Sequence, residues 1–532
     1  MAEKQTPAVE HDGWDEYRNE RIYRNRGKIG FGRSLGYGVF AWFSIAMQGL
    51  VGAWLLFFYT NFAGLSAAAG ASIFLVGRVA DALASLLMGN FSDTLYKYKF
   101  GRKFGRRHFF ILIAAPCSLI AITMWVSGMS YWYYLVTYVL TTILMSVLQI
   151  PWETLPNEMT KDYNERTKMS TTRMVLAGLG NMLVAFVPAQ LFRIWPKSSP
   201  VPYLVAQIGF SVVCFILVLV TYYTTWEHFV SKKEAEDIAR TNSAAQNAHS
   251  FKSELSNYFS TFRIKSFRKH MGIYLFSYLG AFIWTTIFVY YIVDVIGGTA
   301  SDAGYLQSFS IVSIPVTIIA GYLVTKISPR ALYTIGYSLM ILAAICYGAV
   351  AVFHISNWMV LLSIVTFAYE IGLYILYFVP WNTFPFLPDL DTLVTGQNRS
   401  GLFASVMVFI NQVCLGFASV IVGYMLDWAG LIKSTAGSVH QPQSAQNMIV
   451  GLMVLGVGGL ILVALLFASR FHLNRKTIKV LDDELTRLQK GGYIEDVDPN
   501  TRKVCEDLTG VSFAEITVWN SHKKPASENV IK

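Results

Sequence analysis

The chain contains long uninterrupted runs of apolar residues, and these constrain its fold more than any other feature. Two examples are FFILIAAPCSLIAITMWVSG, which begins at Phe109, and NMIVGLMVLGVGGLILVALLFAS, which begins at Asn447. A run of about 20 apolar residues matches the roughly 30 Å hydrocarbon core of a bilayer, and in lipid a helix satisfies its own backbone hydrogen bonds. Only 14% of the 532 residues are charged, against about 25% in soluble proteins. The sequence therefore predicts an all-α integral membrane protein.

Twelve apolar spans can be placed along the chain with windows of about 19 residues. The polar stretch 226–270 separates the sixth span from the seventh. The predicted spans lie at roughly 34–62, 66–90, 109–128, 130–150, 173–195, 202–225, 271–296, 303–326, 331–353, 357–379, 400–428 and 447–469. The domains that follow are an N-terminal tail at 1–33, a six-helix bundle at 34–225, a central loop at 226–270, a second six-helix bundle at 271–469 and a C-terminal tail at 470–532.

The positive charges are distributed unevenly about these spans. Of the 43 Lys and Arg residues, 38 fall in the two tails and in the loops on the same side as the tails. Cytoplasmic loops carry such an excess, so both termini and the central loop are predicted to be cytoplasmic. The net charge of +10 then reflects membrane topology, and no nucleic-acid partner is expected. The first 33 residues are polar, so we expect the first apolar span itself to direct insertion into the plasma membrane.

A short motif, PWxTxP, occurs twice. It reads PWETLP from Pro151 and PWNTFP from Pro380, at the ends of the fourth and tenth predicted spans. A weaker echo relates GNFSD, from Gly89, to GYLVTK, from Gly321, at nearly the same offset. Two echoes at one offset favour an internal repeat of two parallel halves. In both copies we predict that the proline ends the helix and that the tryptophan lies at the membrane interface.

Ionisable residues inside the predicted spans are the main functional candidates, because a charge at membrane depth is costly. Arg78 and Asp81 are three residues apart in the second span and share a helix face. Asp81 either binds a cation or proton, or forms with Arg78 an ion pair that only joins helices. Arg173 opens the fifth span, where it binds substrate or extends to the interface. Glu370, in the middle of the tenth span, is protonated, paired across helices or exposed to an aqueous cavity.

Other polar residues give weaker signals. Asp294 and Asp427 lie at the outer ends of their spans, where we expect them to be solvated. The nine histidines fall in tails, loops or span ends, and the five cysteines show neither metal spacing nor a disulfide framework. No nucleophile stands beside a base, and no phosphate-binding loop occurs. The sequence thus predicts a protein that is not an enzyme and needs no cofactor.

Several motifs in one order resemble the glycoside-pentoside-hexuronide:cation symporters, a family of the major facilitator superfamily that includes the melibiose carrier. They are GRVADALASLLMGNFSD from Gly77, FGRKFGRR from Phe100, QIPWETLPNEMTKDYNERTKMSTTR from Gln149 and TGQNRSGLF from Thr395. The likeness runs from about Gly36 to the start of the C-terminal tail. It implies the major facilitator fold, in which two six-helix bundles rock about a central site. It also implies a small-molecule substrate and a coupling cation.

The resemblance implies a coupling-cation site on the second helix, where the family carries two carboxylates. Asp81 matches the first carboxylate position and Arg78 the neighbouring arginine, but the second carboxylate position is Ser85. A polar residue of the fourth helix near that site matches Ser146. With one carboxylate left, a sodium site loses charge and ligands. The substitution therefore favours H⁺ over Na⁺ as the coupling ion, since a single Asp81 still suffices for a proton.

The resemblance also implies a sugar site. Two carboxylate positions of the melibiose carrier are Ile45 and Gln149 here, so its galactoside specificity is not carried over. Arg173 matches an arginine of its fifth helix, and an arginine without acidic partners would suit a uronide. Glu153, four residues after Gln149, could supply a carboxylate instead. An aromatic position of the tenth helix matches Tyr377, and a lysine position of the eleventh matches Gln412. The predicted substrate-binding residues are Gln149, Glu153, Arg173, Glu370, Tyr377 and Gln412.

The basic loop after the second span resembles a loop that major facilitators carry between their second and third helices. Asp93 at a helix end, with Arg102 and Lys103 nearby, could form a charge latch that stabilises one of two states on the cytoplasmic face. The alternative is that these residues only set the topology.

Together these features predict a secondary active symporter that imports a sugar, glycoside or uronide with a proton or sodium ion, and that is monomeric in the bilayer. Two alternatives stay open, a carrier of an amphiphile such as a lysolipid and a non-transporting sensor. The C-terminal tail supports the sensor, because Leu481, Leu485 and Leu488 form one stripe of a predicted helix. That stripe docks either on a partner or, in the interpretation we prefer, on the protein's own bundle.

Overall fold

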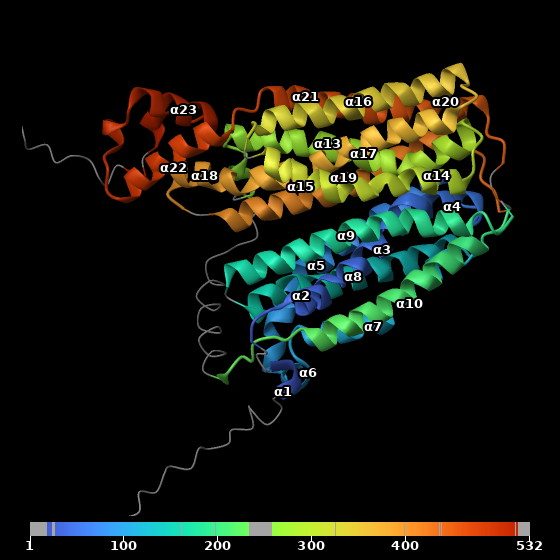
Figure 1. Cartoon of the computed structure of the whole chain (residues 1–532), viewed down its shortest axis with the longest axis horizontal. Coiled ribbons are helices and arrows are strands. Elements are labelled where there is room, and N and C mark those ends of the chain that lie inside the picture. Colours follow the sequence, from blue (N-terminus) through green and yellow to red (C-terminus); the bar gives the residue numbers. More distant parts are fainter. Residues whose placement is uncertain are drawn as a thin grey trace, which may run out of the picture. The chain divides into compact units, whose positions relative to one another are not determined.

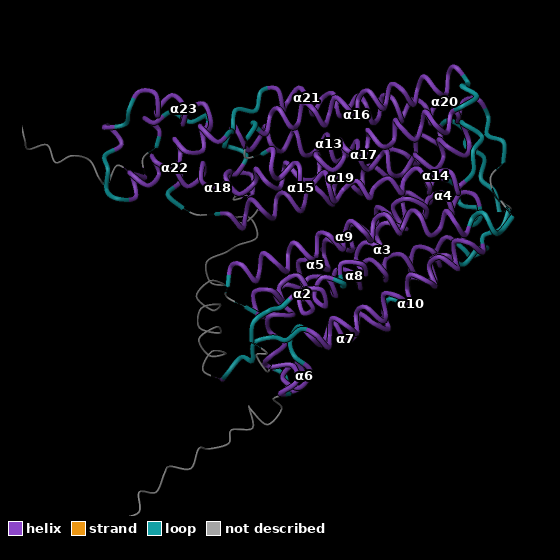
Figure 2. Tube along the Cα trace, in the orientation of Figure 1, coloured by secondary structure: helices purple, strands orange, loops and turns teal. Residues whose placement is uncertain are grey.

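The computed structural model describes residues 19–23, 27–160, 162–196, 198–232, 258–324, 326–397, 399–435, 437, 439–516 and 518–519. Within these ranges the chain forms helices joined by loops and contains no strand, as Figure 2 shows. The apolar runs that dominate the sequence account for this outcome, because helices satisfy their own backbone groups.

The chain divides into two compact units. The first consists of Met1–Val51, Val76–Val184 and Pro200–His249, and the second of Gly52–Leu75, Ala185–Ser199 and Ser250–Lys532. Two long helices, α5 (Ala67–Thr94) and α9 (Tyr163–Leu191), contribute residues to both units.

The long helices of the first unit follow its length in Figure 1. In addition to most of α5 and α9, the unit contains α1 (Glu20–Tyr23), α2 (Phe31–Gly38), α3 (Ala41–Leu50), α6 (Lys99–Phe104), α7 (His108–Cys117), the 3₁₀ turn η3 (Ile120–Trp125), α8 (Tyr131–Met159) and α10 (Val201–Thr224). The short α1 is tied to this unit, because Tyr23 donates its hydroxyl to Arg102 O at 2.8 Å and Glu227 N donates to Ile22 O at 3.1 Å.

The second unit contains the C-terminal helices and the short α4 (Leu56–Asn61). Its other helices are α13 (Lys265–Tyr290), α14 (Ala300–Gln307), α15 (Ser313–Leu323), α16 (Pro329–Phe353), α17 (Trp358–Thr383), α18 (Leu387–Thr395), α19 (Ser400–Trp428), α20 (Gln443–Gly451), α21 (Leu460–Ser469), α22 (Arg475–Gln489) and α23 (Pro499–Thr509). Short π or 3₁₀ segments join several of them: η1 (Val51–Leu55, at the boundary of the two units), η4 (Tyr291–Val295), η5 (Ser308–Val312) and η7 (Leu452–Gly459).

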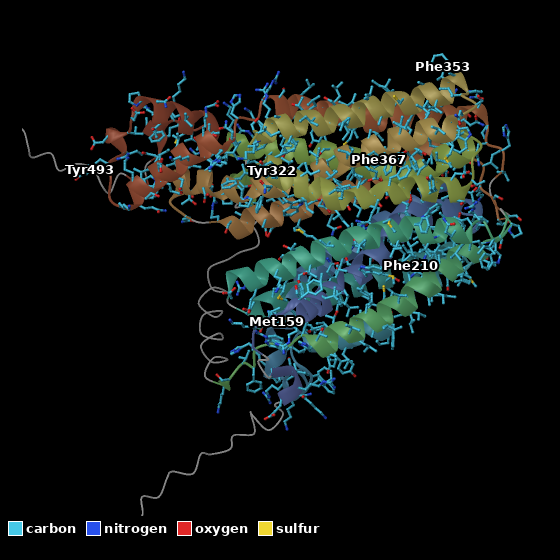
Figure 3. All side chains as sticks on the ribbon, in the orientation of Figure 1. Met159, Phe210, Tyr322, Phe353, Phe367 and Tyr493 are labelled. Carbon is cyan, nitrogen blue, oxygen red and sulfur yellow. The ribbon has the colours of Figure 1, made fainter. Side chains whose placement is uncertain are left out.

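Twelve helical segments of the described chain are long and apolar enough to cross a membrane, which confirms the predicted number. Their outward faces keep apolar side chains exposed, as a lipid-facing surface requires. Phe353, for example, is 74% exposed and lies at the end of the second unit opposite Tyr493 (Figure 3). The chain is therefore a multi-pass membrane protein.

The prolines of the two PWxTxP motifs do not end their helices, so that prediction was wrong. Pro151 and Pro156 lie inside α8, which continues to Met159, and Pro380 lies inside α17, which continues to Thr383. A proline is tolerated within a transmembrane helix where neighbouring helices and hydroxyl side chains satisfy the freed backbone groups. Thr154 and Thr383, which follow the two prolines at equivalent positions, donate hydroxyls to Pro151 O and Pro380 O.

The two outer aspartates are not simply solvated, contrary to expectation. Asp427, on α19, accepts hydrogen bonds from the amides of Ala67 (2.9 Å) and Ala68 (3.1 Å) at the start of α5. These are among the amides that a helix start leaves without intrahelical partners, so Asp427 caps α5. Asp294, in η4, has a buried Oδ2 that accepts no described hydrogen bond.

The C-terminal segment docks on its own unit, as the leucine stripe predicted. Leu481, Leu485 and Leu488 are buried, and α22 and α23 lie beside α18 at one end of the second unit (Figure 1). Asp507 forms an ion pair with Lys265 Nζ at 2.6 Å, and Trp519 Nε1 donates to Leu393 O at 2.8 Å. The hydrogen bond from Lys265 holds the pKa of the Asp507 carboxyl below its usual value.

Candidate functional site

Asp81 is the centre of a buried polar cluster in the first unit. Only 5% of its surface is exposed. Ser146, on α8, donates its hydroxyl to Asp81 Oδ1, and Arg78 Nη1 lies 3.6 Å from Asp81 Oδ2. Three of the four residues predicted for the cation site thus lie together. Ser85, one turn further along α5, is half-buried, and no hydrogen bond among the described residues joins it to Asp81.

Gly77 allows α5 and α8 to approach closely at this cluster. A Cβ at Gly77 would lie 2.2 Å from Cε1 of Tyr138, far inside van der Waals contact. Tyr138 is 1% exposed, and Thr142 donates its hydroxyl to Gly77 O at 3.4 Å. Because glycine has no side chain to displace the Tyr138 ring, α8 comes near enough for Ser146 to reach Asp81.

Five side chains of α3, α8 and α9 form a continuous hydrogen-bonded series, which we call the polar chain. Gln48 Nε2 donates to Ser44 Oγ at 3.1 Å, and Ser44 Oγ donates to Gln149 Oε1 at 2.9 Å. Glu153 Oε1 then accepts from both Gln149 Nε2 and Arg173 Nη2, each at 2.9 Å. The side chains of Glu153 and Arg173 are 39% and 36% exposed, so this end of the polar chain is accessible.

Trp152 lies beneath Arg173 and is buried, so the prediction that it lies at the membrane interface was wrong. It is 1% exposed, and its Nε1 donates to Tyr37 O at 3.1 Å. The indole stacks on Tyr37 and Phe40, with ring centroids 5.2 and 4.8 Å apart. The guanidinium carbon of Arg173 lies 4.5 Å from the Trp152 ring centroid, a distance at which a cation is attracted to the ring face. Trp152 therefore positions Arg173.

Trp42 is a candidate that the sequence did not single out. Its Nε1 is buried and has no hydrogen-bond partner among the described residues. A Cβ at Gly180 would lie 3.7 Å from Trp42 Cδ1 and 3.4 Å from Ile45 Cγ2, so both side chains face α9. Ile45 occupies a position that the family resemblance assigned to the sugar site. The three-residue spacing of Trp42 and Ile45 on one helix was the signal that could have identified it.

Of the candidates in the second unit, Tyr377 belongs to an aromatic group. The ring centroids of Tyr377 and Tyr278 are 5.3 Å apart, and those of Tyr278 and Tyr274 are 4.1 Å apart. Asn411 Nδ2 donates a hydrogen bond to Tyr274 OH at 3.1 Å. Gln412 follows Asn411 on α19 and is half-buried. Glu370, on α17 like Tyr377, is 2% exposed. Among the described residues no three His, Cys, Asp or Glu side chains are grouped as a metal site would require.

The basic loop after α5 forms ion pairs with a residue that the sequence analysis overlooked. Arg106 Nη2 and Arg107 Nε lie 2.7 and 2.8 Å from Glu158 Oε1, at the end of α8. The predicted latch residues lie differently: Arg102 Nη1 donates to a backbone oxygen, Lys97 O, at 3.4 Å, and Lys103 is exposed. The Asp93 side chain lies outside the described residues, so the latch through Asp93 stays a prediction.

Glu227 holds the start of α7 in place. Its carboxylate accepts hydrogen bonds from the backbone amides of Arg106 (2.6 Å), Arg107 (2.9 Å) and His108 (3.0 Å), and His108 Nδ1 lies 3.1 Å from Oε2. Burial acts to raise the pKa of Glu227, but the hydrogen bonds and charge of His108 and the amide of Arg107 outweigh it, so the pKa lies below its usual value. Gly105 (φ +82°) gives the carboxylate room, because a Cβ there would lie 2.8 Å from Glu227 Oε1.

A buried carboxylate on one helix, a polar chain across three others and twelve membrane spans are features of a solute carrier. The family model described as MFS/sugar transport protein matches residues 36–475. The chain belongs to this family. It therefore adopts the major facilitator (MFS) fold of two six-helix bundles, and its class is transport by cation-coupled symport. The family is one of transporters and not of enzymes, and the resemblance seen in the sequence motifs is confirmed.

Named relatives and solved structures agree with this assignment. The uncharacterized symporter YnaJ of Bacillus subtilis is 23% identical, and the match covers 90% of this chain and 99% of the relative. The isoprimeverose transporter of Lactiplantibacillus pentosus is 22% identical, over 82% of this chain and 88% of the relative. The crystal structure of a D-xylose-proton symporter has a TM-score of 0.57 at 17% identity, and the match covers 83% of this chain and 97% of that one. This last likeness shows the fold.

Proposed function

We propose that this MFS protein takes up a neutral sugar or glycoside together with a proton across the plasma membrane. The observation that carries the proposal is the pairing of Asp81 with Arg78 and Ser146 in one buried cluster, within the unit that also holds the accessible polar chain. Both termini, and with them the docked C-terminal segment, are proposed to lie in the cytoplasm.

The Asp81 cluster favours a proton over Na⁺. A metal cation prefers several oxygen ligands, and among the described side chains of this cluster Asp81 supplies the single carboxylate, with a guanidinium 3.6 Å away. That guanidinium would repel a bound Na⁺. A proton needs no such ligand set, because it adds to Asp81 directly, neutralises the carboxylate and weakens its attraction to Arg78. Loss of this ion pair on α5 is the local change through which proton binding would act on the helix.

The polar chain favours an uncharged substrate. Arg173 is already paired with Glu153, so its charge is balanced and a uronide carboxylate would meet Glu153 as well. The side-chain amides and the Ser44 hydroxyl can donate hydrogen bonds to sugar hydroxyls and accept them, and the Trp42 indole N–H, which has no partner among the described residues, can donate one. The polar chain also argues against a lysolipid, whose acyl chain needs apolar contacts. The relative named as an isoprimeverose transporter acts, by that name, on a neutral sugar, in agreement with this proposal.

The coupling role of Asp81 is tested in proteoliposomes with an imposed proton gradient. Sugars and glycosides, isoprimeverose among them, are first screened for uptake with and without the gradient. In Asp81→Asn we expect uphill accumulation to fall while exchange of labelled for unlabelled substrate persists, because the amide mimics the protonated carboxyl. Accumulation in Asp81→Asn equal to that of the unchanged protein would exclude Asp81 as the coupling group. Uptake of no sugar or glycoside by either protein would refute the substrate class.

A further inference from the structure

Glu370 is a second buried carboxyl, and the proton coupling proposed at Asp81 does not use it. It lies in the middle of α17, it is 2% exposed, and its Oε2 accepts no hydrogen bond from any described residue. No Lys, Arg or His of the described chain forms an ion pair with it. An ionised carboxylate without a counter-charge or donors is strongly disfavoured inside a protein.

The groups that face Glu370 are aromatic and neutral. Tyr347 faces it from α16, and Tyr369, Tyr374 and Tyr377 interact with it from α17 itself. The other elements packed most against α17 are α13, α14, η5, α15 and the apolar 3₁₀ turn η6 (Phe384–Phe386) that follows it. In this neighbourhood α13 contributes aromatic rings, and η5 and α15 contribute hydroxyls beside Tyr374; the side chains concerned are Trp284, Tyr278, Ser310 and Ser313. None of these described groups carries a charge that would balance a carboxylate.

The side chains around Glu370 are buried and closely packed. The Trp284 and Tyr369 rings stack with centroids 4.4 Å apart, and these two residues are 3% and 0% exposed. A protonated Glu370 is neutral and gains an O–H donor. The hydroxyl oxygen of Tyr369, which has no described hydrogen-bond partner, is a suitable acceptor in the same cluster. The neutral carboxyl therefore fits this closed arrangement, and the ligand that the site takes is H⁺.

We propose that Glu370 binds and releases a proton of its own in each transport cycle, in addition to the proton at Asp81. The proposal rests on the proton-coupled symport proposed above, and it replaces our expectation that Glu370 contacts the substrate. When a bundle rocks so that water reaches α17, Glu370 can release its proton and form the carboxylate. When the bundle closes again, Glu370 must take up a proton. Two protons would then move with each substrate, one through each unit.

Proton binding at Glu370 can be measured without a substrate. Infrared difference spectra of the purified full-length protein, recorded between acidic and alkaline buffer, report carboxyl groups that gain a proton through their C=O absorption. We expect two such carboxyl signals to be assignable, one absent in Asp81→Asn and another absent in Glu370→Gln. Glu370→Asp keeps a carboxyl and should restore a shifted signal, which guards against a Gln variant that fails to fold. Glu515→Gln, with a 64% exposed side chain, is the control of equal charge change and should keep both signals.

The transport consequence is measured with a gradient of one pH unit at zero membrane potential. Because each coupled proton contributes a factor of about ten to accumulation under this gradient, two protons give about a hundredfold and one gives about tenfold. We expect accumulation by the Glu370→Gln variant to fall from about a hundredfold to about tenfold. Identical infrared spectra in Glu370→Gln and the unchanged protein would overturn the second proton site even if no transported sugar were found. Accumulation unaltered by Glu370→Gln would overturn its coupling role, with the Asp81 proposal left standing.

Discussion

Replacement of Glu153 by Gln should change which sugars the carrier prefers, because it leaves Arg173 without its counter-charge. Glu153 Oε1 accepts hydrogen bonds from Arg173 and from Gln149, both at 2.9 Å. Gln keeps one carbonyl oxygen for these donors but removes the negative charge. A substrate carboxylate could then take its place beside Arg173, and the substitution should favour a uronide over the matching neutral glycoside.

The size of the effect follows from the exposure of the pair. Two unit charges about 4 Å apart interact by roughly 4 kcal/mol at an effective dielectric constant of about 20. The Arg173 side chain is 36% exposed, and solvent-exposed pairs contribute only about 0.2–1 kcal/mol. An intermediate gain of about 1–2 kcal/mol is therefore expected, which corresponds to roughly a 5- to 30-fold shift in relative affinity.

The assay compares methyl glucoside with methyl glucuronide as competitors of labelled substrate uptake. The ratio of their inhibition constants should move toward the glucuronide by this factor in Glu153→Gln. In Glu515→Gln, the exposed variant with the same charge change, the ratio should stay as it was. A ratio in Glu153→Gln that matches the unchanged protein would refute the reasoning that Glu153 neutralises Arg173 at the substrate site.

Two further predictions concern the framework around the sites. Gly77→Val places its Cβ 2.2 Å from the Tyr138 ring, and this overpacking should lower the free energy of unfolding by about 1–3 kcal/mol. It should also separate Ser146 from Asp81, so uptake should fall sharply. Gly209→Val, at an open position, should retain uptake. Glu227→Gln should lower the free energy of unfolding by about 2–4 kcal/mol near neutral pH, since a buried carboxylate with three amide donors and His108 loses its charge. Because the folded pKa of Glu227 lies below its usual value of 4.5, its contribution is complete above that pH and is lost as the pH falls through the folded pKa. Thermal unfolding of the purified protein at several pH values should show the gap between the two proteins closing in acid; a gap of constant size would contradict the assignment.

The sequence was sufficient for features that depend on local composition. Runs of about 20 apolar residues identified all twelve spans, and the i, i+3 spacing placed Arg78 and Asp81 on one helix face. The family resemblance brought Ser146 to Asp81 from 65 residues away. The first two successes share a cause, since helix periodicity and bilayer thickness act on short stretches and do not need tertiary contacts, whereas the contact between Ser146 and Asp81 came from the resemblance alone.

The features that the sequence did not reveal depend on contacts between distant segments. Trp152 is buried because Tyr37, 115 residues earlier, accepts its N–H, and a tryptophan next to proline reads as interfacial without that partner. Asp427 caps a helix that begins 360 residues before it. The Glu158 pairs were missed because Arg102 and Lys103 are nearer than Arg106 and Arg107 to Asp93 in the sequence, and sequence distance gave no indication of which basic residue faces α8.

The two PWxTxP motifs show how one architectural frame can carry different chemistry in the two units. The threonine hydroxyl returns to the proline carbonyl in both copies, so the local helix geometry is shared. The two residues between the proline and the threonine differ in their environments and contacts. Trp152 is 1% exposed beneath Arg173, while Trp381 is 41% exposed, and Glu153 supplies the carboxylate that Asn382 cannot. Of the two motifs, only the one in the first unit therefore contains a charge-balanced pair. In the second unit the carboxylate lies ten residues before the motif proline, at Glu370, where it is buried among tyrosines. In our proposals, the motif-bearing helix of the first unit thus contributes to substrate recognition and that of the second unit to proton binding.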